Sequence, residues 1–384
     1  RGGSPPSNTL DVLGQANGRP GISYARIALF TPLRADLAWS LRREADGTRV
    51  LLDASASRAS EGKVVSWEWR IGDRAATGAR AEALLARGGP LPVTLTVKDG
   101  RGNRRTLTRS LAIPVGPADL GLKEWPLALR TEAEGFAAEG GGTIHVRADK
   151  RAASALSLSH WNTKGHWLEW EIESPWETEC FLLARYATPE DAGRAITLDG
   201  KTLGAMRFPA TGGYGSDTQD DWSVAVLRGE DGKPLPARLS RGAHRIRLEN
   251  ADGAGLNLDT LDWVPRKSLP LPEGFRVIDG EAGKAAIPLS GVLCPSRMSH
   301  EIGSCYTVPL GPLYPGDGIK DGPASTLRLY EDGKELGPAH APHVEIREKG
   351  QGRFSHWVTS LYLSASDNTD PRANGRRYTW RIER

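Results

Sequence analysis

The sequence predicts an all-β protein built from β-sandwich domains in series. Short runs of alternating apolar and polar residues recur along the chain, as in VTLTVKDGRGNRRTLTRSLAI, and most of them end at Gly, Asn or Asp. Helical periodicity is scarce, and we expect a helix only at RAEALLARG, residues 80–88, and a short turn at TPEDAGRA. The 384 residues suffice for two to four domains of roughly 100–200 residues each.

Composition excludes some classes of function. The net charge is +3, from 50 basic and 47 acidic residues, and this near-balance gives no reason to expect a nucleic-acid partner. No apolar run reaches the ~18–20 residues of a membrane span, so we expect no membrane insertion. The start, RGGSPPSNTL, has neither an initiator Met nor a signal-peptide core, and we therefore expect a piece of a longer protein. Cys294 and Cys305 either pair in an oxidising compartment or remain two buried thiols.

Changes in pattern divide the chain into five segments. An N-terminal segment, which is either the tail of an upstream domain or an added strand, precedes three units, and a linker rich in Pro and Gly follows the first of them. In chain order the segments are 1–38 (N-terminal), 39–115 (first unit), 116–127 (linker), 128–266 (second unit) and 267–384 (third unit). In the first segment SPPSNTLDVLGQANGRPG is typical of a loop, and ISYARIALFTPL of a strand.

Three pieces of the first unit, LDASAS, WEWRIGD and VTLTVKDGRGN, resemble the PKD domain, an immunoglobulin-like sandwich. The stretch GGPLPVTL departs from that family's usual approach to the last hairpin. Alternation places Trp67 and Trp69 on one face of their strand, and Asp99 has the turn chemistry expected of Asp. The resemblance implies a spacer, because such domains act mostly as spacers in secreted bacterial enzymes.

The second unit carries motifs in the order found in a carbohydrate-binding module of family 35, or of the related family 6. These are EAE, GHWLEWEIE, LLARYAT, PATGGYG, RGAHRIRLEN and GLNLD. The resemblance spans the whole unit. It implies a jelly-roll β-sandwich without catalytic activity, with a structural calcium ion and a sugar site in the loops at one end.

Three acidic residues are the predicted calcium ligands. Glu132 and Glu134 lie two apart on a first strand and point to the same side, and Asp259 on the last strand reaches them if the two ends of the unit pair. Calcium takes six to eight oxygen ligands, and without a cation the carboxylates would repel one another. The resemblance puts the family's calcium ligands at the same positions. The alternative is that both glutamates are exposed and that Asp259 bonds a loop amide.

The predicted sugar-binding residues are Asn257 and three loop aromatics, Trp161, Tyr214 and Trp222. An amide offers both a donor and an acceptor to vicinal hydroxyls, and in the resembling modules an Asn before the calcium-binding Asp bonds the sugar. Sugars stack on flat aromatic rings, and binding residues concentrate on loops. For each ring the alternative is a lid over the core.

The third unit predicts a further β-sandwich, with strands at STLRLYEDGKEL, HVEIREKG, HWVTSLYLSAS and RRYTWRIER. Its segment LYEDGKELGPAHAPHVEIREKGQGRFSHW resembles accessory regions of bacterial glycan-related proteins. A weaker second sugar site is predicted at His340, Arg353, His356 and Trp357. The alternative is that the neighbouring SASDNTDPRANGR is a loop that satisfies its own backbone.

Together these features predict a non-catalytic carbohydrate-binding accessory region of a secreted bacterial polysaccharide-degrading enzyme. We expect an extracellular monomer, linked to an upstream catalytic domain, that binds a polysaccharide or oligosaccharide. One alternative is a hydrolase or lyase with its site in the third unit, using Asp367, Asp370 and His356. The two aspartates, three apart in one loop, are however expected to cap backbone amides. A second alternative is a structural or adhesive surface protein.

Overall fold

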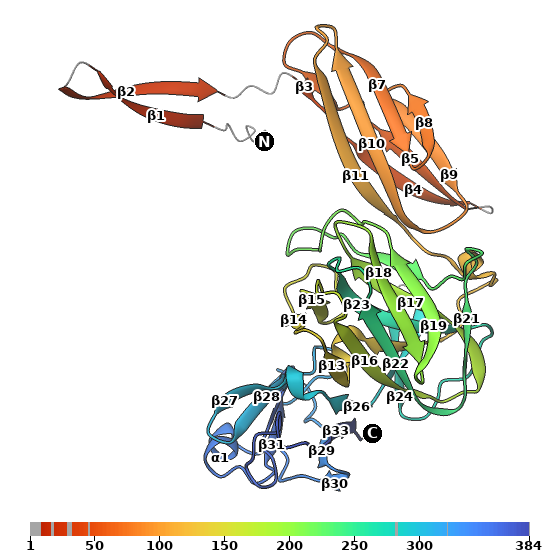
Figure 1. Ribbon diagram of the computed structural model, residues 1–384, viewed down its shortest axis with the longest axis vertical. Helices are drawn as coiled ribbons and strands as arrows, with labels where there is room; N and C mark the ends of the chain where they lie inside the picture. Colours follow the sequence, from red (N-terminus) through yellow and green to blue (C-terminus); the bar gives the residue numbers. More distant parts are fainter. Residues whose placement is uncertain are drawn as a thin grey trace. The chain divides into compact units, whose positions relative to one another are not determined.

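The computed structural model describes residues 9–16, 19–28, 33–44, 47–280, 283–320 and 322–383, with side chains from residue 33 onward. The chain forms two compact units, one reaching to Leu85 and including Pro92–Arg109, the other comprising Ala86–Leu91 and Ser110 to the end. At the start of the first compact unit, β1 (Thr9–Ala16) and β2 (Arg19–Ala28) pair as a hairpin (Figure 1). The segment predicted as a loop thus contains β1. In the predicted strand ISYARIALFTPL, residues 22–28 lie in β2 and Leu33 begins β3 (Leu33–Arg34), while residues 29–32 are outside the described residues.

The first domain is a β-sandwich, as predicted. One sheet has the order β11-β10-β7-β8, another the order β4-β5-β9, and a short β3–β6 pair accompanies them. Trp67 and Trp69 share a face, and their indole nitrogens donate to the carbonyls of Ala54 and Gly78. The strands are β3 (Leu33–Arg34), β4 (Ala38–Glu44), β5 (Gly47–Asp53), β6 (Arg58–Ala59), β7 (Val64–Ile71), β8 (Arg74–Thr77), β9 (Arg80–Leu85), β10 (Gly89–Asp99) and β11 (Arg104–Ile113).

The helix predicted at 80–88 is wrong. Residues Arg80–Leu85 form β9, which pairs with β5 from Asp53↔Arg80 to Thr48↔Leu85. The run of Ala and Leu has helical propensity, but pairing with β5 buries Ala83 beside Val50, and this tertiary contact overrides the local preference. The predicted turn chemistry of Asp99 is confirmed, since its carboxylate accepts from the backbone amides of Arg101 and Asn103.

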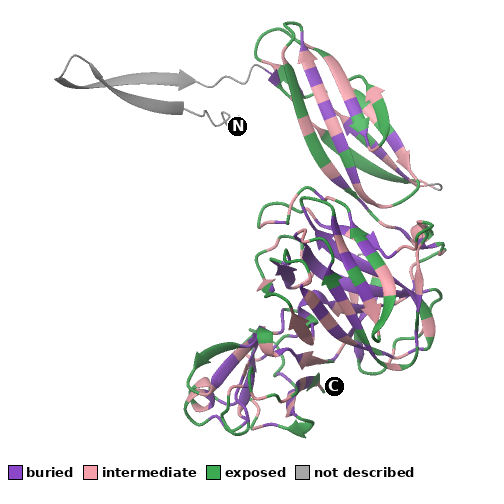
Figure 2. Cartoon of the chain, viewed as in Figure 1, coloured by how far each residue is buried: buried purple, intermediate pink, exposed green. Residues whose placement is uncertain are grey.

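The second of the two compact units, which contains residues 110 onward, begins with a jelly-roll sandwich whose two sheets enclose one apolar core (Figure 2). The first sheet contains β12 (Ala128–Glu132), β14 (His145–Arg147), β15 (Ser157–Ser159), β17 (Thr178–Ala187), β20 (Ser223–Val226), β21 (Pro236–Leu239) and β23 (Asn257–Pro265). The facing sheet contains β13 (Ala138–Gly140), β16 (Trp167–Ser174), β18 (Ala192–Leu198), β19 (Lys201–Phe208) and β22 (Gly242–Asn250).

The central strand β23 joins the two ends of the jelly roll, as the sequence predicted. It pairs with β12 on one side, Glu132 opposite Thr260, and with β17 on the other. The β17 register passes from Arg185↔Thr260 to Tyr186↔Leu258, so Asp259 is the extra residue of a β-bulge. Every residue of β23 is buried. Because the bulge leaves Asp259 outside the regular pairing with β17, the Asp259 carboxylate departs from the alternation of side chains along this buried strand.

The boundary predicted at residue 266 does not separate two sheets. The hairpin β24 (Phe275–Gly280) and β25 (Gly283–Pro288) extends the first jelly-roll sheet, because β25 pairs in parallel with β12 through Ala128↔Ala285. Ala285 and Ala128 share a small apolar cluster with Phe181. The predicted linker contains a 3₁₀ turn, η1 (Pro117–Leu120), whose Leu120 packs into this cluster.

The end of the chain forms a smaller sandwich of two sheets, of orders β26-β33-β29-β30 and β27-β28-β32-β31, around a core of its own. Its elements are β26 (Ser290–Leu293), η3 (Pro295–Arg297), β27 (Ser299–Ile302), β28 (Cys305–Pro309), β29 (Leu327–Glu331), β30 (Lys334–Glu335), α1 (His343–Glu348), β31 (Phe354–Trp357), β32 (Ser360–Leu363) and β33 (Tyr378–Ile382). The all-β fold class is confirmed.

The strand predicted at HVEIREKG is instead the helix α1. It starts after Pro342, and Glu345 forms an i,i+4 ion pair with Lys349. Ile346 is the one buried residue of this helix. The apolar and polar residues that predicted a strand therefore do not alternate between buried and exposed positions. Cys294 and Cys305 are free, buried thiols. In the part of the chain that the structure describes, no helix is long and apolar enough to span a membrane.

Candidate functional site

Two of the predicted sugar-binding residues meet at the loop end of the jelly roll. Asn257 begins β23 and is buried, and its side-chain amide donates to the backbone carbonyl of Tyr214 at 2.6 Å. The Tyr214 ring remains 41% exposed. Its hydroxyl lies so close to Gly255 that a Cβ there would sit 2.2 Å away. Asn257 therefore anchors the loop, and Gly255 gives the ring room to lie over the backbone.

The other two predicted platforms, Trp161 and Trp222, require a correction. Trp161 is fully buried in the jelly-roll core, and its indole nitrogen donates to the carbonyl of His166. Trp222 is 3% exposed and donates to the carbonyl of Arg151. Because both rings are enclosed by protein atoms, neither can stack on a sugar in this structure. Both rings therefore pack against the core, as the alternative interpretation of these residues predicted.

A buried arginine organises the same loop end, and sequence reasoning missed it. Arg194 on β18 is fully buried, donates to the carbonyls of Trp161 and Ala254, and lies 4.6 Å from the Trp161 ring centroid. Burial lowers its pKa to about 10. The side-chain amide of Asn250 donates to the same two carbonyls. Alternation with buried Ala192 and Ile196 was the signal that Arg194 points inward.

The three predicted calcium ligands lie near the end of β12, where Ser154 connects two of them. The Ser154 hydroxyl lies 2.7 Å from Glu132 Oε2 and 3.0 Å from Asp259 Oδ1, so it links the two carboxylates. Asp259 also accepts from the Ser154 amide at 2.9 Å and from the Arg185 guanidinium. Both acidic side chains are buried. Asp259 is thus already neutralised within the protein, whereas Glu132 has one oxygen engaged.

Glu132 and Glu134 each retain a buried oxygen without a hydrogen-bond partner, Oε1 of Glu132 and Oε2 of Glu134. Burial raises the pKa of Glu132 to about 8, with a further rise from nearby Asp259, and it raises the pKa of Glu134 well above its usual value, with a further rise from Glu132. Glu134 lies in the 3₁₀ turn η2 (Ala133–Gly135) that follows β12. Below the pair, Arg130 and Asp262 form a buried bidentate ion pair at 2.7 and 2.8 Å.

These residues fit a cation in part. The unpaired oxygens of Glu132 and Glu134 are hard ligands of the kind calcium takes. Among the described residues, however, no group of three His, Cys, Asp or Glu side chains is arranged to hold a metal ion. Asp259, bound to Arg185 and Ser154, does not complete the expected trio. The two glutamates alone present free carboxylate oxygens.

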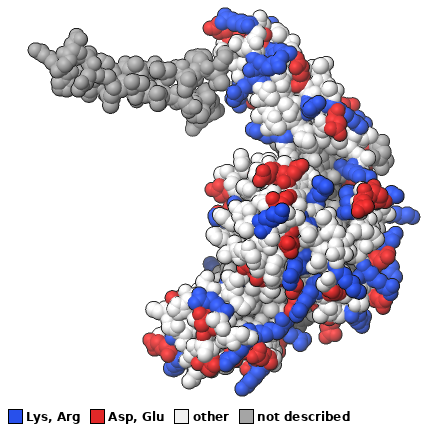
Figure 3. Space-filling view, in the orientation of Figure 1, with Lys and Arg blue, Asp and Glu red and all other residues white. Residues whose placement is uncertain are grey.

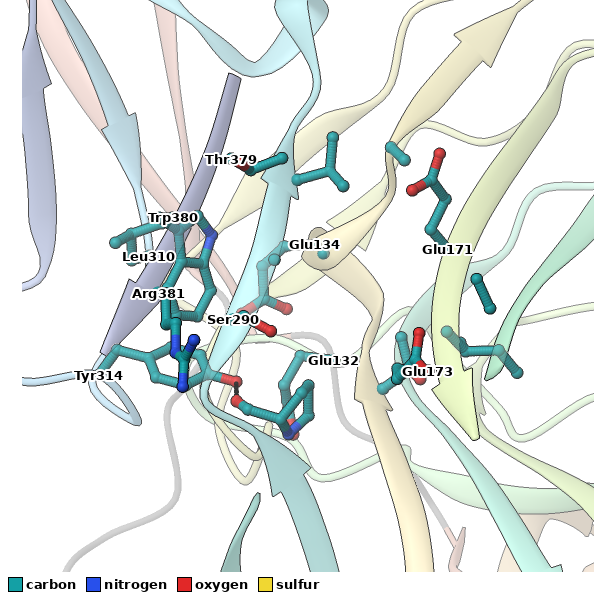
Figure 4. Close-up of a pocket in the computed structure, with 18 of the residues that line it drawn as sticks. Glu132, Glu134, Glu171, Glu173, Ser290, Leu310, Tyr314, Thr379, Trp380 and Arg381 are labelled. Atoms are coloured by element: carbon teal, nitrogen blue, oxygen red, sulfur yellow. Dashed lines mark hydrogen bonds between the residues drawn. The ribbon is translucent and has the colours of Figure 1, made fainter. Parts of the chain in front are cut away.

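The same glutamates line a cleft of about 540 Å³ between the jelly roll and the terminal sandwich (Figure 4). Glu132 and Glu134 lie between the rings of Trp380 and Tyr314 on one side and β16 on the other. Ser290, Thr379 and Arg381 are among the lining residues contributed by β26 and β33. Sequence reasoning missed this cleft, because its walls come from segments about 250 residues apart in the chain.

The second predicted sugar site is partly assembled. His340 is exposed, and its Nδ1 lies 2.6 Å from Asp317 Oδ2. The Asp317 backbone bonds His356 and Val358, and Trp357 between them is 45% exposed. His356 itself is buried, with Nδ1 2.8 Å from Ser325 Oγ, so its expected sugar contact is not available in this structure. Arg353 instead bonds the Gly350 carbonyl and pairs with Glu345.

The aspartates of the hydrolase alternative cap their own loop. Asp367 accepts from the Thr369 amide and pairs with Arg376, and these bonds lower its pKa. Asp370 accepts from the Arg372 amide and side chain, and its pKa falls to about 2. A carboxyl with a lowered pKa is a poor proton donor near neutral pH.

On the face drawn in Figure 3, acidic and basic residues are interspersed.

Comparisons with known proteins confirm the resemblance of the first unit to the PKD domain. Residues 35–115 match the family model of the PKD domain. A family 35 carbohydrate-binding module from Clostridium thermocellum is 21% identical, with a TM-score of 0.28, over 35% of this chain and 96% of that one. A family 35 module from Cellvibrio japonicus is 20% identical, with a TM-score of 0.30, over 36% and 94%.

A family 6 module from a marine laminarinase of Zobellia galactanivorans is 19% identical, with a TM-score of 0.29, over 36% of this chain and 98% of that one. All three similar structures are carbohydrate-binding modules, of the two families that the sequence resembles. The sequence matches none of the curated proteins.

Proposed function

We propose that this chain is a non-catalytic carbohydrate-binding accessory region of a secreted bacterial polysaccharide-degrading enzyme. The observation that carries the proposal is the exposed Tyr214 ring, held over Gly255 at the loop end by the bond from Asn257. A flat ring fixed at the rim of a sandwich offers a stacking surface to the C–H face of a sugar. The order of the sequence motifs along residues 128–266, which resembles that in carbohydrate-binding modules, also supports the proposal.

The binding derives from a preorganised loop. Arg194 and Asn250 both donate to the Trp161 and Ala254 carbonyls, and this shared network ties together two of the loops at that end. Because the loop carrying Tyr214 is already ordered, a sugar that stacks on the ring pays little further conformational entropy. A single shallow platform gives weak binding, and linkage to other modules or to a catalytic domain raises the effective affinity.

Calcium is part of the proposal. Glu132 and Glu134 would hold the ion, because each has a buried oxygen that lacks a partner. The cation would supply positive charge between two carboxylates that otherwise repel each other. Its role there is structural: it would fix the turn η2 against β12.

Affinity electrophoresis through gels containing soluble polysaccharides tests the sugar-binding proposal. The wild-type chain, with calcium present, should be retarded by at least one neutral polysaccharide, and Tyr214→Ala should migrate freely. Trp39→Ala is a matched control, because Trp39 is also exposed but belongs to the PKD domain. Wild-type migration unaffected by every polysaccharide, or equal retardation of Tyr214→Ala, would refute the proposal.

A further inference from the structure

The cleft between the jelly roll and the terminal sandwich has the dimensions of a ligand site. Its volume of about 540 Å³ falls within the range of roughly 300–1,000 Å³ typical of small-molecule sites. Its walls come from β12, η2 and β16 on one side and from β26 and β33 on the other. Neither Tyr214 nor Asn257 lines it. The cleft is therefore distinct from the loop-end platform.

The floor of the cleft contains buried polar atoms that lack a hydrogen-bond partner, one on each of Glu132, Glu134 and Arg297. Glu132 and Glu134 are at least nine-tenths buried, line the cleft, and each leaves one carboxylate oxygen unpaired. A buried polar atom without a partner is unfavourable, so a ligand that forms a hydrogen bond with it is stabilised. Hydroxyl groups form such bonds. A calcium ion held by the same two side chains would supply positive charge there, which a hydroxyl oxygen also favours. The chemistry that fits is the same in either state.

One wall of the cleft is aromatic and rigid. The rings of Tyr314 and Trp380 meet edge to face, with centroids 4.8 Å apart. The Tyr314 hydroxyl donates to the Pro288 carbonyl, and Gly291 lies against the Trp380 indole, where a Cβ would approach to 2.9 Å. Both rings belong to the core of the terminal sandwich and are only 6–7% exposed, so they are fixed before any ligand arrives and line the cleft with a small part of their surface. Fixed aromatic edges beside carboxylate acceptors match a molecule that has C–H surfaces and hydroxyls together.

The mouth of the cleft is polar and electrically balanced. Arg377 pairs with Glu171 across it, with one contact of 2.9 Å, and joins β16 to the terminal sandwich. Arg381 and Glu173 also line the cleft and carry opposite charges. Four arginines and four glutamates line the cleft, so its lining has no net charge and a neutral ligand meets no electrostatic penalty.

We propose that this cleft is a second carbohydrate site, which takes a neutral saccharide unit with its hydroxyls toward Glu132 and Glu134. The inference deepens the proposed function and rests on it for the class of ligand. It gives the terminal sandwich a role, since β26 and β33 complete a site that the jelly roll alone would leave open.

Calorimetric titration in calcium-containing buffer tests the proposal, with cellotetraose, mannotetraose and xylotetraose as neutral probes and tetragalacturonate as the acidic probe. Ser290→Trp fills the cleft from β26, where Ser290 is exposed. Ser299→Trp is the matched control, on exposed β27 away from the cleft. If thermal unfolding shows that Ser290→Trp is misfolded, Thr379→Tyr serves as the blocking variant.

We expect a neutral probe to bind the wild-type chain at two sites. Tyr214→Ala should keep only the cleft site and Ser290→Trp only the loop-end site, with affinity at the lost site reduced about tenfold or more, a change of roughly 1.4 kcal/mol. If Ser290→Trp binds like Ser299→Trp, the cleft proposal is overturned and the loop-end proposal stands. If Ser290→Trp alone abolishes binding, the cleft stands and the loop-end platform fails. Wild-type binding of no neutral probe, or of tetragalacturonate alone, overturns the cleft.

Discussion

The side-chain amide of Asn257 donates a 2.6 Å hydrogen bond to the backbone carbonyl of Tyr214, so the first residue of a buried strand positions an exposed ring. Because of this bond, the amide that the sequence assigned to the sugar is used inside the protein. Its contribution to binding is then to position Tyr214, with Gly255 making room for the ring.

Asn257→Ala should weaken carbohydrate binding by about tenfold, corresponding to ~1.4 kcal/mol, because the loop loses its anchor. Asn257→Asp should fail in the same way, since an ionised carboxylate has no hydrogen to donate. Affinity electrophoresis measures both. Asn374→Ala, which removes a 2.9 Å bond to the Tyr378 hydroxyl in the terminal sandwich, is the control. Undiminished retardation of Asn257→Ala would show that the bond is dispensable.

Trp222→Ala should destabilise the second unit by about 3–5 kcal/mol, the usual cost of removing a buried large aromatic ring. Trp222 packs with only 3% of its surface exposed and receives Arg185 at 5.3 Å from its ring centroid. Tyr214→Ala should change stability by less than about 1 kcal/mol, because that ring is largely exposed. Urea unfolding compares the two. A Trp222→Ala protein of normal stability that has lost only sugar binding would restore Trp222 as a platform.

Calcium should raise the thermal midpoint of the second unit, and a chelator should lower it. An ion at 100 times its dissociation constant adds about 2.7 kcal/mol, which corresponds to a few degrees. The double variant Glu132→Gln, Glu134→Gln should lose the response, because it removes both free carboxylates. Glu190→Gln, at an exposed position, should retain it. A midpoint that is equal in calcium and chelator would count against the ion.

The stability of the second unit should decrease slightly as the pH rises past the ordinary histidine pKa of 6.5. Burial alone lowers the pKa of His244, but bonds to the Asp199 carboxylate, 2.7 Å away, and to the Ser240 carbonyl outweigh it, and nearby Glu173 adds to the rise. A raised folded-state pKa contributes stability that is complete below the unfolded value and lost as the pH rises through the folded value.

Because Asp199 is about half exposed, solvent screening limits this effect to less than about 1 kcal/mol. Urea unfolding at pH 5.5, 7 and 8.5 measures it. Asp199→Asn should reduce the loss between pH 5.5 and 8.5, since the partner that raises the His244 pKa is gone. An identical pH dependence in Asp199→Asn would assign the change to other groups.

The alternating strands, the PKD match and the meeting of β12 with β23 follow from local pattern and motif order, because strand alternation and turn residues are properties of short segments. Local pattern also misled twice. The Ala- and Leu-rich segment at β9 became a strand through its pairing with β5, and the alternating segment after Pro342 became α1. In both cases the environment beyond the segment decided its structure.

By itself, the sequence determined the all-β class of fold and the PKD domain, since strand alternation and turn residues are properties of short segments. Only the tertiary structure decided that Trp161 and Trp222 are enclosed while Tyr214 is exposed, and that Arg185 neutralises Asp259. It alone brought β26 and β33 beside Glu132 and Glu134. The physical reason is that burial and charge pairing depend on which distant segments pack together, and one segment's residue pattern does not specify its neighbours.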